Sequence, residues 1–94
     1  MKPQELTARR VLVRGRVQGI GFRWRAQQEA QSLGLGGWVK NLPDGSVEAH
    51  VQGEPRAVEE MLAWLSHGPS HAQVLRCEVE PAEVERARGF EIRG

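Results

Sequence analysis

The stretch "VLVRGRVQGIGFRWRAQQ", residues 11–28, has an apolar start, a glycine-rich middle and a helical end. The apolar run Val11–Val13 is largely β-branched, which predicts a central strand that Gly15 ends. Gly34 then lies where a helix would close. Between Gly15 and Gly34, apolar residues recur at helical spacing: Phe22, Ala26, Ala30 and Leu33. The stretch therefore predicts a strand, a tight turn and a helix in direct succession.

Working outward, the next segments predict a hairpin and a second helix. In "GWVKNLPDGSVEAHVQG" (37–53), apolar and polar residues alternate along the second arm. The turn Leu42–Gly45 has proline at its second position and glycine at its last. Pro55 suits the first turn of a helix, which Gly68 and the proline after it would end. The apolar stripe of that helix is Val58, Met61, Leu62 and Leu65.

The last part of the chain predicts a fourth strand, in which Leu75, Cys77 and Val79 alternate with charged residues, and a short fifth at "GFEIR" (89–93). The order β-α-β-β-α-β with one further strand indicates the α+β class. We expect a ferredoxin-like split β-α-β antiparallel sheet of four to five strands, with two helices on one face. Because no repeat or linker interrupts the chain, residues 1–94 are expected to form a single domain.

Composition and charge exclude several classes of protein. A length of 94 residues, 39% hydrophobic and 27% charged, is typical of one globular domain. No apolar run is long enough to cross a membrane, and "MKPQELTARR" has no apolar segment of a secretory signal. The lone Cys77 cannot form an internal disulfide, which favours a reducing compartment. We therefore expect a cytoplasmic protein with no membrane partner.

Positive charge gathers around the turn that precedes the first helix. The net charge is +1, yet residues 6–28 hold six of the thirteen Lys and Arg and no acidic residue. Gly19 and Gly21 let the backbone approach a ligand closely. The helix that follows directs its unpaired N–H groups into the bend. Arg23 lies in the first helical turn, where a cation is unfavourable unless an anion lies beside it.

The residues alone leave two interpretations of this turn open. One is a cradle of backbone amides for a tetrahedral anion. The other is a structural connection whose arginines are solvated. The turn is not a Walker A loop, since it lacks the Gly-Lys-Ser/Thr ending, nor a Rossmann fingerprint, since Trp24 occupies the place of the third glycine.

Three motifs together resemble the acylphosphatase family: "GRVQGIGFR" (15–23), the hairpin segment (37–53) and "GFEIR" (89–93). They lie in the family's order and at the spacing of a stand-alone member, so the resemblance covers nearly the whole chain. It implies a ferredoxin-like fold and the hydrolysis of acyl phosphates, at the carboxyl–phosphate bond, to a carboxylate and inorganic phosphate. It also implies that the enzyme uses no metal and no cofactor.

The resemblance implies particular site residues. The family's phosphate-binding arginine falls on Arg23, and its water-positioning asparagine falls on Asn41. Backbone amides of the preceding loop would hold the phosphate, at Gln18, Gly19, Ile20, Gly21, Phe22 and Arg23. Inorganic phosphate or sulfate should then bind as product or inhibitor. The sequence departs from the family's common pattern at Trp24, Arg25 and Gly21. We expect these departures to affect leaving-group preference, and we expect Gly21 to make the loop tip more mobile.

Other conspicuous residues are expected to have structural roles. Packing is expected of Cys77, Trp38 and Trp64, and Asp44 is assigned to its turn. The histidines are expected at the surface or in loops: His50, His67 and His71. A solvated basic rim, able to steer an anion toward the site, is expected from Arg9, Arg10, Arg14 and Arg16.

Two other classes of function share this order of elements. RNA-recognition domains stack bases on aromatic residues of the sheet. The segment "SVEAHVQG" (46–53) has no aromatic residue and the chain has no tyrosine, so we expect no specific nucleic-acid partner. A non-catalytic accessory or sensing domain is the other alternative. We expect instead a monomer that acts on small acyl phosphates.

Overall fold

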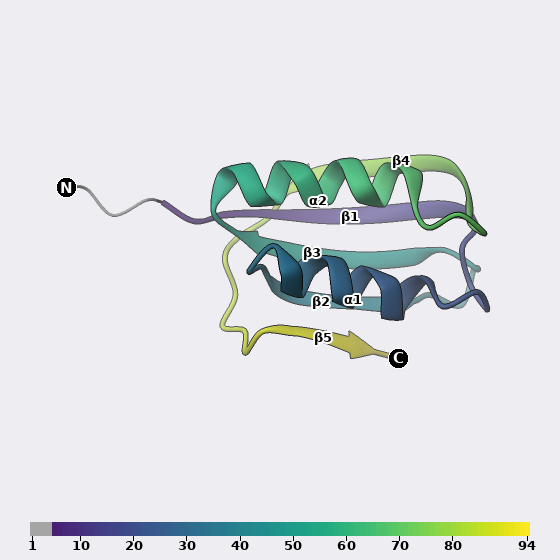
Figure 1. The fold of residues 1–94 in the computed structure, drawn as a ribbon, viewed down its shortest axis with the longest axis horizontal. Helices are drawn as coiled ribbons and strands as arrows, with labels where there is room; N and C mark the ends of the chain where they lie inside the picture. Colours follow the sequence, from purple (N-terminus) through teal and green to yellow (C-terminus); the bar gives the residue numbers. More distant parts are fainter. Residues whose placement is uncertain (1–4) are drawn as a thin grey trace.

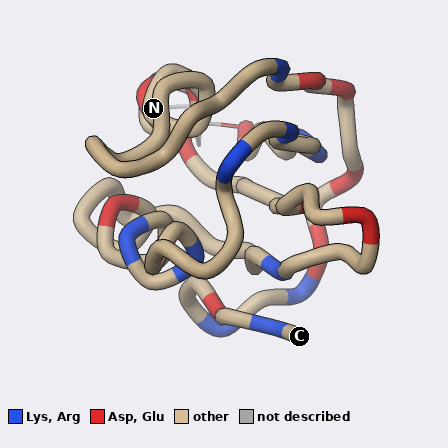
Figure 2. Tube along the Cα trace, turned by 90° about the vertical axis from the view of Figure 1, so that its right-hand side faces the viewer, with Lys and Arg blue, Asp and Glu red and all other residues tan. Residues whose placement is uncertain are grey.

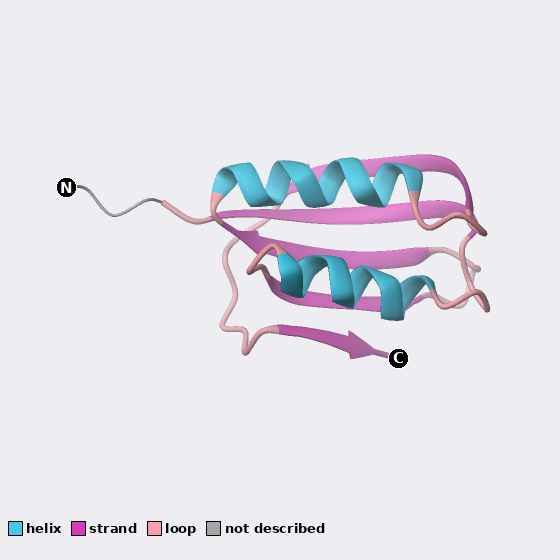
Figure 3. Cartoon of the chain, in the orientation of Figure 1, coloured by secondary structure: helices cyan, strands magenta, loops and turns pink. Residues whose placement is uncertain are grey.

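The computed structural model describes residues 5–94, which form one five-stranded sheet with both helices on the same face (Figure 1, Figure 3). The strand order is β4-β1-β3-β2-β5, and neighbours are antiparallel except for the parallel pair β2 and β5. The predicted α+β arrangement is thereby confirmed, and the C-terminal strand lies at the sheet edge beside β2. The elements are β1 Thr7–Arg16, α1 Phe22–Ser32, β2 Gly36–Asn41, β3 Val47–Gly53, α2 Pro55–His67, β4 Gln73–Pro81 and β5 Phe90–Arg93.

The core lies between the helices and the sheet, where both predicted helical stripes are buried. Helix α1 packs over β2 and β5, and α2 packs over β1, β3 and β4. Each large side chain buried here contributes about 1.5–3 kcal/mol of stability. Leu33 and Leu62 are only partly buried at the edges of the stripes. The buried helical residues are Phe22, Ala26, Ala30, Val58, Met61 and Leu65.

Strand β1 does not end at Gly15 as predicted; it continues to Arg16. Arg14 pairs with Arg76, but the next residue, Gly15, pairs with Val74, so β4 has one extra residue at this point. Gly15 has φ 135°, and a Cβ there would overlap the carbonyl oxygen of Gln73. The glycine therefore permits a β-bulge at which β4 approaches β1 closely.

The bulge changes which side chains of β4 face the core. Its extra residue, Leu75, is 73% exposed, while Val74 and Cys77 pack against the core. Val79 is also exposed, because β4 is an edge strand. The predicted strand is confirmed, but its apolar alternation does not form one buried face. The expected packing role of Cys77 is confirmed, and partial burial raises the pKa of its thiol.

The expectation that His50 lies at the surface is wrong. Its side chain is fully buried, its Nε2 lies 2.8 Å from the Oε1 of Gln52, and its ring stacks on Trp38. The segment after β4 covers this face of the sheet through Glu85. The Glu85 carboxylate accepts a hydrogen bond from Trp38 Nε1, and the backbone N–H and carbonyl oxygen of Glu85 are hydrogen-bonded to the Gln52 side chain. His67 is exposed, as expected.

The expected basic rim is balanced by carboxylates at two of its arginines. Arg10 lies 3.3 Å from Glu48, and Arg14 lies 3.0 Å from Glu78 and 3.4 Å from Asp44. Figure 2 views the molecule from the end where β1 leads into α1, and basic and acidic segments are interspersed there. In the described part of the chain, these two arginines are thus neutralised by carboxylates, and the predicted rim carries less positive charge than the sequence alone indicates.

Candidate functional site

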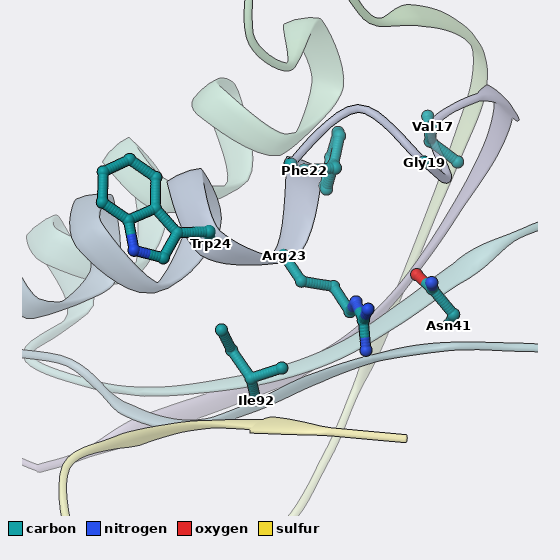
Figure 4. Close-up of a pocket in the computed structure, with 8 residues that line it drawn as sticks. Val17, Gly19, Phe22, Arg23, Trp24, Asn41 and Ile92 are labelled. Carbon is teal, nitrogen blue, oxygen red and sulfur yellow. The ribbon is translucent and has the colours of Figure 1, made fainter.

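The glycine-rich turn, the start of α1, the end of β2 and strand β5 meet around one pocket (Figure 4). Its volume is about 170 Å³. The fold brings Arg23 and Asn41, the two residues that the resemblance implies, into this pocket from separate elements. The lining residues are Val17, Gly19, Gly21, Phe22, Arg23, Trp24, Asn41 and Ile92.

The turn has the backbone geometry of an open cradle. Gly19 and Gly21 have φ of 77° and 79°, in the left-handed region that favours glycine. A Cβ at either position would meet no atom within 4 Å, so the space in front of the turn is open. Gly21 is the N-cap of α1, and no side chain caps this end and no acidic residue lies in the first turn. The N–H groups of the helix start thus remain available to an anion.

The side chain of Gln18 fastens this turn to the β2–β3 hairpin. Its Nε2 donates to the carbonyl oxygens of Leu42 and Ser46, both at 2.8 Å. Leu42 directly follows Asn41, so the two hydrogen bonds hold the cradle beside the end of β2. The resemblance predicts a role for only the backbone of Gln18, and no pattern in the sequence indicates this side-chain contact.

Arg23 extends from α1 toward the end of β5. Its Nη1 donates to the carbonyl oxygens of Arg93 at 3.4 Å and Gly94 at 3.0 Å. The Nε and Nη2 donors have no hydrogen-bond partner within residues 5–94. The guanidinium is thus held from one side and can still bind a phosphate oxygen through its remaining N–H groups.

Asn41 is the last residue of β2 and presents an unsatisfied acceptor. Its Oδ1 is buried and has no hydrogen-bond partner among residues 5–94. Leaving a buried acceptor unpaired costs about 1–3 kcal/mol. Such an atom suits a bound water, which would donate a hydrogen bond to it.

The described residues offer neither a metal cluster nor a membrane span. Across residues 5–94 no three His, Cys, Asp or Glu side chains group closely enough to hold a metal ion. In the same part of the chain, no helix has the length and apolar character that crossing a membrane requires. Among the described residues that line the pocket, Arg23 alone is charged.

Three lining residues were not among the predicted site residues, and one of them, Trp24, was expected only to affect leaving-group preference. Val17 precedes the glycine-rich turn, and Ile92 comes from β5. Ile92 could have been identified only from the pairing of β5 with β2, and the sequence did not predict where β5 would lie. Ile20 belongs to the predicted cradle but is partly buried against the core.

Comparisons with known proteins point to one family. The acylphosphatase family model matches residues 9–92. An acylphosphatase of Thermococcus kodakarensis is 51% identical over 80 residues, which cover 85% of this chain and 88% of the relative. One of Nitrosococcus oceani is 48% identical over 88 residues, covering 94% and 99%. The solved acylphosphatase of Coxiella burnetii superposes with a TM-score of 0.89 at 39% identity, covering 94% and 93%. The resemblance inferred from the three motifs is confirmed.

Proposed function

The chain belongs to the acylphosphatase family and is a hydrolase of acyl phosphates, and we propose that it carries out this hydrolysis in the pocket that contains Arg23 and Asn41. One observation supports this location above the others. Arg23 and Asn41 both line one pocket at an uncapped helix N-terminus, and within residues 5–94 the arginine has unpaired donors and the asparagine an unpaired buried acceptor. An anion and a water molecule would satisfy both.

The phosphoryl group would bind between the turn and the arginine. Backbone N–H groups of residues 18–23 would donate to its oxygens, aided by the positive end of α1. Arg23 would donate through its free N–H groups, and the hydrogen bonds to β5 would hold the guanidinium in place. Such fixed donors stabilise charge that redistributes in the transition state, without reorganisation during the reaction.

The attacking water would be oriented by Asn41. Its Oδ1 would accept one hydrogen of the water and direct the oxygen at phosphorus. The new P–O bond forms as the P–O bond to the acyl group breaks, and the carboxylate leaves with the bonding electrons. A carboxylate is a good leaving group, so positioning and charge stabilisation are the main demands on the protein. The proton of the water would pass to a phosphoryl oxygen, which yields inorganic phosphate.

Three further properties belong to this proposal. The protein would act as a monomer, in which the fold of one chain brings Arg23 and Asn41 to the same pocket. Residues 1–94 would work as a single acylphosphatase-like domain without metal or cofactor. The location would be the cytoplasm, where a protein with the single free Cys77 remains reduced.

The test compares two neighbouring arginines of α1. Arg23→Ala should lower kcat/KM for benzoyl phosphate by about 10²–10³-fold, since it removes a donor aimed at the transferred group. Arg25→Ala is the matched control, because Arg25 is an exposed arginine of the same helix that does not line the pocket. Loss of ultraviolet absorbance reports the hydrolysis. Equal losses in both variants, or none in either, would refute the assignment.

A further inference from the structure

The pocket has a polar half and an apolar half. The polar half contains the glycine turn, Arg23 and Asn41, and the apolar half contains the exposed side chains of Trp24 and Ile92. Val17 and Phe22 also line the pocket, but both are buried in the core. These two side chains are among the most exposed large apolar residues of the described chain, at 55% and 40%. Exposed apolar groups that flank a binding pocket commonly contact a ligand. Both belong to the wall of the one pocket that holds the proposed reaction.

The direction of the reaction places the acyl group against this apolar half. In phosphoryl transfer the attacking and leaving oxygens lie roughly in line, on opposite sides of phosphorus. Figure 4 shows the Arg23 side chain ending between Asn41 on one side and Ile92 and Trp24 on the other. With the water at Asn41, the leaving carboxylate departs toward Ile92 and Trp24. The acyl group then lies next to the two apolar side chains.

The lack of charged residues among the described lining residues other than Arg23 favours uncharged acyl groups over charged ones. On β5, Ile92 is on the same face as Phe90, which packs against the helices. Arg93 points to the other face, where its guanidinium lies 5.2 Å from the Trp38 ring centre. No described lining residue other than Arg23 is charged, and Arg23 serves the phosphoryl group. A second anionic group on the substrate would find no cationic partner among these lining residues, whereas an apolar group would cover apolar surface there.

We propose that Trp24 and Ile92 form an acyl subsite that selects acyl phosphates with an uncharged, apolar acyl group larger than acetyl. This inference rests on the function proposed above, because it needs the phosphate at Arg23 and the water at Asn41. The ring of Trp24 offers a flat face to an aromatic acyl group. Ile92, a residue of β5, would contact the acyl group from the side of the sheet.

The test is the ratio of kcat/KM for benzoyl phosphate to kcat/KM for acetyl phosphate, in each variant relative to wild type. The intrinsic reactivities of the two substrates cancel in this comparison. Trp24→Ala and Ile92→Ala should each lower the ratio by about 10-fold, the effect of losing one apolar contact to a substrate. The control is Val79→Ala, which removes a similarly exposed apolar side chain (46%) from the other edge strand and should leave the ratio unchanged.

Further measurements separate the possible failures. Trp24→Phe keeps an aromatic face and should retain most of the ratio, and thermal unfolding checks that each variant is folded. An unchanged ratio in both Trp24→Ala and Ile92→Ala would overturn the subsite. This holds whether the two variants keep their activity or lose it equally on both substrates. In either case, competitive inhibition of the wild type by inorganic phosphate, together with benzoyl phosphate hydrolysis, would leave the proposed function standing. Absence of hydrolysis in the wild type would instead refute that function and the subsite with it.

Discussion

Arg23 and Asn41 face the same pocket, but their proposed contacts predict different kinetic defects. Arg23 would touch the phosphoryl group in both the ground and transition states, whereas Asn41 would touch only the water. Asn41→Ala should therefore lower kcat by about 10²–10³-fold. The inhibition constant of inorganic phosphate should stay close to the wild-type value. Steady-state kinetics with and without phosphate measure both quantities.

Thermal unfolding of the same variant distinguishes a catalytic from a structural role. Asn41 adjoins the hairpin turn, but its Oδ1 has no hydrogen-bond partner in the part of the chain that the structure describes. Replacing it by alanine removes an unpaired buried acceptor, so the melting temperature should not fall. A variant that melts earlier than wild type yet keeps its turnover would show that Asn41 holds the turn and does not position the water.

At the scale of elements, the bulge between β1 and β4 depends on Gly15. Gly15→Ala combines a positive φ with overlap between the new Cβ and the Gln73 carbonyl oxygen. Gly34→Ala is the matched control, since its φ of 71° is also positive but its Cβ would meet no atom within 4 Å. The control should lose about 1–2 kcal/mol from backbone strain alone. Gly15→Ala should lose clearly more, measured by denaturant unfolding.

If Gly15→Ala and Gly34→Ala lose the same free energy of unfolding, β4 moves away from the new Cβ without a further loss of stability. In that case the close approach of the two strands would not be what requires glycine at position 15. The comparison also tests the register that places Val74, and not Leu75, against the core.

Local patterns predicted the type of every helix and strand, but they did not predict where the sheet would be covered. The stripe that begins at Phe22 is set by helical spacing, which needs no tertiary information. His50 alternates like a surface residue, and only the distant segment around Glu85 buries it. Likewise, the end of β1 depends on the partner strand and not on Gly15 itself. Contacts between residues far apart in sequence are what the local pattern omits.

The same limit applies to the site at the scale of the whole molecule. The motifs identified Arg23 and Asn41, because they lie within long stretches shared with the family. The side-chain bonds of Gln18 to the hairpin and of Arg23 to β5 join segments that only the folded chain brings together. Ile92 lines the pocket because β5 pairs in parallel with β2. Residue types could be predicted, whereas the contacts that hold them in place could not.

Phosphate binding should stabilise the whole molecule, because the cradle exists only in the folded state. Inorganic phosphate at ten times its dissociation constant should add about 1.4 kcal/mol to the free energy of unfolding. For a domain of this size that corresponds to a rise in melting temperature of about 6–11 °C. Arg25→Ala should keep this rise, while Arg23→Ala at the same phosphate concentration should lose most of it.

Repeating the phosphate titration with excess chelator tests whether a metal ion contributes. The positive field of the proposed site comes from backbone N–H groups, the helix end and Arg23, so chelation should change neither the rise in melting temperature nor the hydrolysis of benzoyl phosphate. A strict requirement for added Mg²⁺ or Zn²⁺ in either measurement would contradict the proposed mechanism. An equal rise in Arg23→Ala and wild type would instead place the phosphate away from this pocket, because the guanidinium could not then be a ligand.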